Sequence, residues 1–249
     1  MCGRFAMDDK MDGYIEELVL SHGLGVIDDF SKHLPRWNIK PTDDIPVILH
    51  STRLGHDAVA VARWGFIPVW AKSIQAAPRT LFNARSESAV WREDDGRASM
   101  WRAPLAKGQR CLVPASGYFE WSGPKSHRTP HWIHPGQGML AFAGLYGWWT
   151  DPARSPDDPG RTRLTATILT MASVPRLASI HDRNPVALPP SAWWDWIDPE
   201  VTGDQNLVAE MVAEARPVLT ALHEHEVAPF GAASDGPDLV RPAQTIVGD

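Results

Sequence analysis

The first five residues of the chain, Met1-Cys2-Gly3-Arg4-Phe5, carry its most distinctive chemistry. Once Met1 is removed, Cys2 presents a free α-amine beside its thiol. Such a 1,2-aminothiol condenses with an aldehyde, first as an imine and then, after thiolate attack, as a five-membered thiazolidine ring. Unperturbed pKa values of about 7.7–8.0 for the amine and about 8.5 for the thiol leave both groups partly nucleophilic at neutral pH. A cysteine near a terminus is more often an inert small hydrophobic residue, so Cys2 needs partners elsewhere in the chain.

Aldehyde capture also needs groups that move protons, and two residues suit that work. Glu120 lies in the apolar and aromatic run CLVPASGYFEW, where desolvation would raise the pKa of its carboxyl group and suit it to general acid catalysis. His181 titrates near neutrality and could share this role. Each also has a purely structural interpretation, because Glu120 could pair with an arginine and His181 could be an ordinary loop histidine.

Three arginines and two tryptophans could hold a nucleic acid. Arg4, Arg85 and Arg183 each lie within three residues of a candidate site residue, which for Arg85 is Asn83. A guanidinium group can form two hydrogen bonds to the oxygens of one phosphate. Exposed tryptophans such as Trp70 and Trp121 can stack on the bases of single strands. The alternatives are surface ion pairs with the chain's 30 acidic residues, and core packing for most of its 12 tryptophans.

The hydrophobic pattern predicts the elements that position these residues. Helical spacing favours helices over residues 13–20, in the segment 91–108, from a cap at Ser191, and over 206–216 up to Pro217. If residues 82–89 are extended, Asn83, Arg85 and Glu87 share one face. The expected fold is one α+β domain over residues 1–249, with a strongly curved, barrel-like, mainly antiparallel sheet flanked by helices. Further strands are expected over 47–49, 58–64, 111–121 with breaks at Pro114 and Gly117, 139–149 and 164–170.

Composition limits the classes of function. Hydrophobic residues make up 43% and charged residues 22%, as in ordinary globular proteins, and the net charge of -6 argues against bulk nucleic-acid binding. Without an apolar run of about 18 residues no membrane span is expected, and without an N-terminal basic region followed by an apolar run no signal peptide is expected. The protein is therefore predicted to be cytoplasmic. No phosphate loop, dinucleotide fingerprint or convincing metal-ligand spacing occurs, so no cofactor and no metal are expected. Cys2 and Cys111 are expected to be free thiols.

Seven ordered blocks, MCGRF, RWNIKPT, RWGFIPVW, FNARSES, CLVPASGYFEW, FAGLY and IHDRNPVAL, carry a family resemblance. In these blocks the sequence resembles the SRAP family, the SOS-response-associated peptidases or abasic-site-processing proteins, over about residues 2–190 and more loosely to Pro242. The resemblance implies a curved β-structure around a positively charged groove. It also implies a protein that senses abasic sites in single-stranded DNA, junctions included, and crosslinks to them as a monomer.

The resemblance assigns roles to individual residues. Cys2 matches the nucleophile whose amine and thiol form a thiazolidine with the ring-opened deoxyribose, and Asn83 matches the asparagine that holds Cys2. Glu120 and His181 match the acid and base pair at the sugar. The matches to phosphate-contacting positions are Arg4, Arg85 and Arg183.

Two departures and two alternatives qualify this prediction. Asn184 stands where relatives often carry methionine or arginine, which puts a DNA contact from that position in doubt, and the segment APFGAAS (228–234) replaces an asparagine-containing one. The alternative functions are a Cys-dependent peptidase, in which Cys2 cleaves peptides or its own leader, and a non-covalent single-strand binder whose affinity falls steeply with salt.

Overall fold

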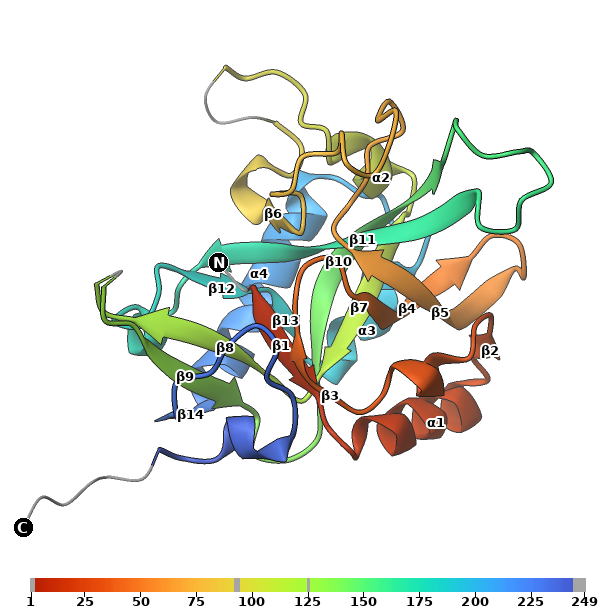
Figure 1. Cartoon of the computed structure of the whole chain (residues 1–249). Helices are drawn as coiled ribbons and strands as arrows, with labels where there is room; N and C mark the ends of the chain where they lie inside the picture. Colours follow the sequence, from red (N-terminus) through yellow and green to blue (C-terminus); the bar gives the residue numbers. More distant parts are fainter. Residues whose placement is uncertain (1–2, 92–94, 125, 244–249) are drawn as a thin grey trace, which may run out of the picture.

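The computed structural model describes residues 3–91, 95–124 and 126–243, which form two sheets with helices outside them (Figure 1). Short 3-10 helices η1 to η4 occupy Phe30–His33, Ser86–Ser88, Pro175–Leu177 and Pro237–Val240. The α-helices are α1 (Met11–His22), α2 (Arg102–Ala106), α3 (Pro190–Ile197) and α4 (Gln205–Ala221). The strands are β1 (Arg4–Met7), β2 (Gly25–Val26), β3 (Arg36–Ile39), β4 (Asp44–Ser51), β5 (His56–Trp64), β6 (Asn83–Arg85), β7 (Arg110–Ala115), β8 (Gly117–Ser122), β9 (Thr129–His134), β10 (Leu140–Thr150), β11 (Thr162–Ala172), β12 (Arg183–Pro185), β13 (Ala187–Leu188) and β14 (His223–Glu226).

The larger sheet closes on itself. Antiparallel pairings run from β5 through β4, β7 and β10 to β11, and a parallel pairing of β11 with β5 completes the ring. Closure removes the free edges of these strands and gives the barrel expected from the sequence. Near its end β11 also pairs with β6 in parallel and with β12 in antiparallel fashion, so segments from distant parts of the chain converge there.

The smaller sheet has the strand order β14-β9-β8-β1-β3 and packs beside the barrel. Successive side chains of its strands point to opposite faces of the sheet and join two different apolar clusters. Phe5 of β1 turns toward the barrel core, where its ring lies 4.9 Å from that of Trp64, whereas Ala6 joins the smaller cluster with Phe119 and Trp132. The sheet therefore has one face on the main core and one face under the C-terminal segment.

A sharp change of direction between β7 and β8 joins the two sheets. The backbone N–H of Ser116 donates to the carbonyl of Ala6 in β1, so the chain leaves the barrel at this residue. Gly117 follows, and a Cβ there would lie 2.5 Å from the Trp132 ring, which explains the glycine. The strand interruption expected at Pro114 is therefore wrong: Pro114 stays in β7 opposite Ala141, and the break comes two residues later.

Buried Arg110 ties α2 and α3 to the barrel. Its guanidinium donates to the carbonyls of Leu105 at 2.9 Å, Trp196 at 2.5 Å and Val201 at 3.0 Å, and also to that of Asp198. These carbonyls stand near the C-terminal ends of the two helices, where a cation is favoured. In Figure 1, α3 and α4 lie behind the strands, and α3 contacts β7, β10 and β13.

Two helix boundaries differ from those expected. The N-cap of α3 is Pro189 and not Ser191, because Pro190 fits the first helical turn with its fixed φ and missing donor. Helix α4 does not end before Pro217 but continues through it, because buried Ala215 and Leu219 keep the packed face intact on both sides. No helix in the described residues is long and apolar enough to cross a membrane.

Candidate functional site

Glu120 occupies the inner face near the end of β8 and is only 3% exposed. Strand alternation places it on the same face as Tyr118, toward the main core, and places Trp121 on the opposite face with Phe119. Burial raises the pKa of the Glu120 carboxyl, and the charge of protonated His181 opposes this rise. The structure thus brings Glu120 and His181 within electrostatic reach, and the raised pKa of Glu120 is the direction of shift that general acid catalysis requires.

His181 lies in the turn between η3 and β12. The backbone N–H of Arg183 donates to its Nδ1 at 3.0 Å, and a carboxylate oxygen of Asp182 lies 2.9 Å from the same nitrogen. These contacts exclude each other, because Nδ1 must lack a proton to accept from Arg183 and must carry one to donate to the Asp182 carboxylate. The backbone contact is fixed by the fold, whereas the Asp182 side chain is 86% exposed, so neutral His181 carries its proton on Nε2. The Asp182 contact then applies when the ring is protonated.

Asn184 connects this turn to β8 through hydrogen bonds, a role that was not predicted from the sequence. Its Oδ1 accepts from the Ser173 hydroxyl at 2.9 Å and from the Val174 N–H at 3.0 Å, while its Nδ2 donates to the Tyr118 hydroxyl at 3.3 Å. The side chain is 1% exposed and faces the interior. Asn184 therefore links the strand that carries Glu120 to the turn that carries His181.

Strand β6 carries Asn83 and Arg85, which pair in register with Ile168 and Thr170 of β11. Asn83 and Arg85 are extended, but the chain turns into η2 at Ser86–Ser88, so the condition under which Glu87 would share their face is not met. Asn83 is half-buried and Arg85 is exposed to solvent.

Arg183 forms a two-pronged ion pair with Glu87. Its Nη1 and Nη2 lie 2.7 and 2.8 Å from the two carboxylate oxygens, and Nη2 also donates to the carbonyl of Thr170 at 2.6 Å. Burial alone would raise the pKa of Glu87, but the hydrogen bonds and charge of Arg183 outweigh burial and hold that pKa below its usual range. The charge of Arg183 is thus already compensated, whereas its predicted phosphate contact stays a prediction.

Arg4 has a neutral partner instead. Its Nη1 donates to the Oδ1 of Asn38 at 2.7 Å, and burial lowers the pKa of its guanidinium. Trp121 is partly buried, with its ring 5.7 Å from that of Phe230. Trp70 is 65% exposed in the loop between β5 and β6. Arg4 and both tryptophans are accessible to a ligand to different degrees.

The structure describes only one of the two cysteines of the sequence. Cys2 lies outside the described residues, and the prediction that it is the nucleophile stays a prediction. Cys111 is a free cysteine, and complete burial strongly raises the pKa of its thiol, so it holds no reactive thiolate.

The histidines that the sequence shows in close pairs do not form a metal site in the described part of the chain, where no group of three or more candidate ligands is placed to hold an ion. His131 instead lies between Ser122 at 2.7 Å and Glu224 at 2.5 Å.

Comparisons with known proteins agree on one family. The profile of the family described as SOS response associated peptidase (SRAP) matches residues 1–229. The chain is 30% identical over 212 residues to the abasic site processing protein YoqW of Bacillus subtilis, which covers 83% of this chain and 84% of the relative. It is 27% identical over 251 residues to the abasic site processing protein YedK of Escherichia coli, covering 97% and 100%. The crystal structure of a protein from Bacteroides thetaiotaomicron shares the fold, with a TM-score of 0.70 at 21% identity over 98% of this chain and 100% of that one.

Proposed function

The chain belongs to the SOS response associated peptidase (SRAP) family, and from that membership we propose that it recognises abasic sites in single-stranded DNA and captures them covalently. The names of its relatives, abasic site processing proteins, support the choice of substrate. The main observation that supports covalent capture is that Glu120 is buried, has a raised pKa and interacts electrostatically with His181. A carboxyl group whose pKa is raised is better suited to donate the proton that imine formation needs.

The covalent step balances with groups of this chain. The α-amine of Cys2 adds to the aldehyde carbon of the ring-opened deoxyribose and gives a carbinolamine. Glu120 donates a proton to the departing hydroxyl, which leaves as water, and the imine forms. The thiolate of Cys2 then adds to the imine carbon, the nitrogen takes up a proton, and the thiazolidine closes. His181 accepts and returns protons as the sugar ring opens.

Chain connectivity supports the assignment of Cys2 to this site. Two peptide links separate it from Arg4, so their Cα atoms lie within about 7.6 Å of each other whatever the local conformation. Arg4 pairs in register with Phe119, the residue directly before Glu120. This register supports the proposal that Cys2 acts together with Glu120, and Cys111, the other cysteine of the sequence, is buried within the barrel.

The test is intact-mass analysis of the protein before and after incubation with an oligonucleotide that carries an abasic site. Protein without Met1 should gain the mass of the oligonucleotide less one water. Cys2→Ser keeps the amine but lacks the thiol, so it should give only an imine that borohydride must trap. Cys2→Ala protein that retains Met1 should give no thiazolidine, because no thiol adjoins its α-amine, and an undiminished stable adduct in that protein would refute the proposal.

The same samples separate the two alternative functions. Peptide hydrolysis that disappears when Cys2 is blocked would favour a Cys-dependent peptidase. Salt-sensitive binding that ignores the lesion and leaves the protein mass unchanged would favour a non-covalent single-strand binder.

A further inference from the structure

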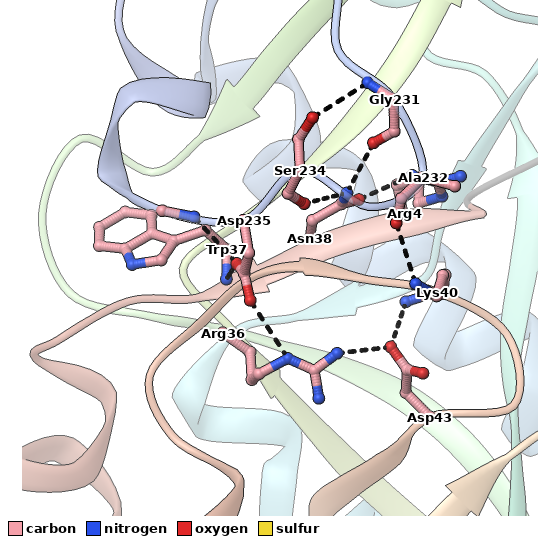
Figure 2. A network of polar contacts seen from close by, with 11 residues as sticks. Arg4, Arg36, Trp37, Asn38, Lys40, Asp43, Gly231, Ala232, Ser234 and Asp235 are labelled. Atoms are coloured by element: carbon pink, nitrogen blue, oxygen red, sulfur yellow. Dashed lines mark hydrogen bonds and ion pairs between the residues drawn. The ribbon is translucent and has the colours of Figure 1, made fainter.

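The loop Gly231–Asp235 lies against β3 and holds one of its side chains in a fixed orientation (Figure 2). Asn38 of β3 is 2% exposed, and its Nδ2 donates to the carbonyls of Gly231 at 3.1 Å and Ser234 at 2.6 Å. Its Oδ1 accepts from Nη1 of Arg4 at 2.7 Å. Asn38 thus stands between the loop and the arginine.

The assignment of oxygen and nitrogen in this amide follows from its neighbours. Carbonyl oxygens cannot donate, so the Asn38 Nδ2 must face the loop, and a guanidinium cannot accept, so Oδ1 must face Arg4. A flipped amide would place donor against donor and acceptor against acceptor. The loop therefore determines which atom Arg4 meets.

The loop itself is anchored at several points around Asn38. Asp235 accepts from the backbone N–H of Trp37 at 2.7 Å and lies 3.5 Å from the Arg36 guanidinium, and Lys40 donates to the Ala232 carbonyl at 2.9 Å. Before the loop, the Phe230 ring packs 4.8 Å from that of Phe119. The segment 228–234, in which the sequence indicated a weakened DNA contact, uses its backbone carbonyls to hold β3.

A neutral partner orients Arg4 without cancelling its charge. Asp43, an acid that interacts electrostatically with Arg4, accepts hydrogen bonds from the Arg36 guanidinium at 2.8 Å and from the Lys40 N–H at 3.1 Å. Arg183 contrasts with Arg4, because Glu87 compensates its charge directly. Of these two arginines, Arg4 keeps the net charge and the additional N–H donors that a phosphate needs.

We propose that Asn38 is a positioning residue that aims the guanidinium of Arg4 at a phosphate of the bound single strand, and that the loop Gly231–Asp235 sets the orientation of Asn38. This inference rests on the proposed function for its ligand. It adds a specific residue, outside the predicted site, through which the C-terminal segment acts on DNA binding.

The experiment measures anisotropy of a single strand carrying a tetrahydrofuran abasic analogue, which has no aldehyde and cannot be captured. Asn38→Asp places a carboxylate against Arg4 and should weaken binding roughly tenfold or more. It should also reduce the slope of log affinity against log salt by about 0.7, as Arg4→Ala does, since one phosphate contact is lost. Gln137→Glu, the same charge change in an exposed loop, is the matched control and should bind like wild type.

A double-mutant cycle tests positioning. Asn38→Ala should weaken binding in the wild-type background and add little once Arg4 is alanine, and Asp235→Asn should weaken it to a smaller degree. Unfolding midpoints of all variants identify losses caused by unfolding alone. Equal losses from Asn38→Ala with and without Arg4, or wild-type affinity of Asn38→Ala, would overturn the inference. Binding of a strand with a natural abasic site, without covalent capture of its aldehyde, would instead overturn the proposed chemistry alone, and absence of any strand binding would overturn both.

Discussion

Replacing Asn184 with alanine should loosen the turn that carries His181 and destabilise the whole fold. The side chain is fully buried and makes hydrogen bonds to Ser173, Val174 and Tyr118. Alanine removes all of these bonds without offering a substitute group. Because the turn and β8 then lose their link, capture of an abasic strand should also slow.

The size of the loss in free energy of unfolding depends on which hydrogen bonds each former partner of Asn184 can still form. The Val174 N–H is buried and loses the Asn184 acceptor, which costs about 1–3 kcal/mol. The Ser173 hydroxyl can turn to the Val174 carbonyl at 3.3 Å, so its loss is smaller. With the remaining bonds, each contributing about 0.5–1.5 kcal/mol, the expected loss is about 2–4 kcal/mol. For a chain of this size that corresponds to a fall in Tm of roughly 4–16 °C.

Urea denaturation with tryptophan fluorescence measures the free energy of unfolding. If the m-value is unchanged, the values for the variant and the wild type can be compared directly. Asn206→Ala is the matched control, because Asn206 is exposed and its change should stay within about 0.5 kcal/mol. A loss below 0.5 kcal/mol for Asn184→Ala would show that water or a shifted turn replaces these hydrogen bonds, and the structural role assigned to Asn184 would fail.

Three further changes test other parts of the structure. Glu120→Gln should slow adduct formation about 10²–10⁴-fold. Because burial raises the Glu120 pKa, the stability from its protonated form is lost as pH rises through the folded pKa. The variant should therefore gain stability relative to wild type, in urea titrations, as pH rises from about 4.3 through that pKa. Glu87→Gln should cost at most about 1 kcal/mol at pH 7. The Glu87 pKa is held low, so this gap in thermal stability should close as pH falls from about 4.3 through the folded pKa. Arg110→Met leaves several buried carbonyls without donors and should cost at least about 3 kcal/mol in urea denaturation.

The sequence predicted the features that depend on local pattern. Alternating apolar residues indicated the curved sheet, and the aromatic neighbours of Glu120 indicated its buried setting and raised pKa. Boundaries were less predictable where tertiary packing outweighs a local signal. Pro217 would end an isolated helix, but α4 continues through it because the buried face on either side stays packed.

Long-range polar pairs could not be predicted from the sequence. Asn38 and Ser234 are 196 residues apart, and Glu87 and Arg183 are 96 apart, so no spacing rule connects them. The sequence marked Arg4 and Arg183 as equivalent candidates for phosphate. They differ only in their partners, a neutral amide for one and a carboxylate for the other, which the fold determines.

The pairing of β1 with β8 has a consequence for the timing of synthesis. Arg4 and Gly117 are separated by 113 positions in the chain, and β1 cannot complete its place in the smaller sheet until β8 has been made. At about 5–20 residues per second, roughly 6–23 s pass between the two on the ribosome. During that interval the start of the nascent chain is open to the enzymes that trim initiator methionine, so the removal of Met1 that the proposed chemistry requires can precede the pairing of β1 with β8.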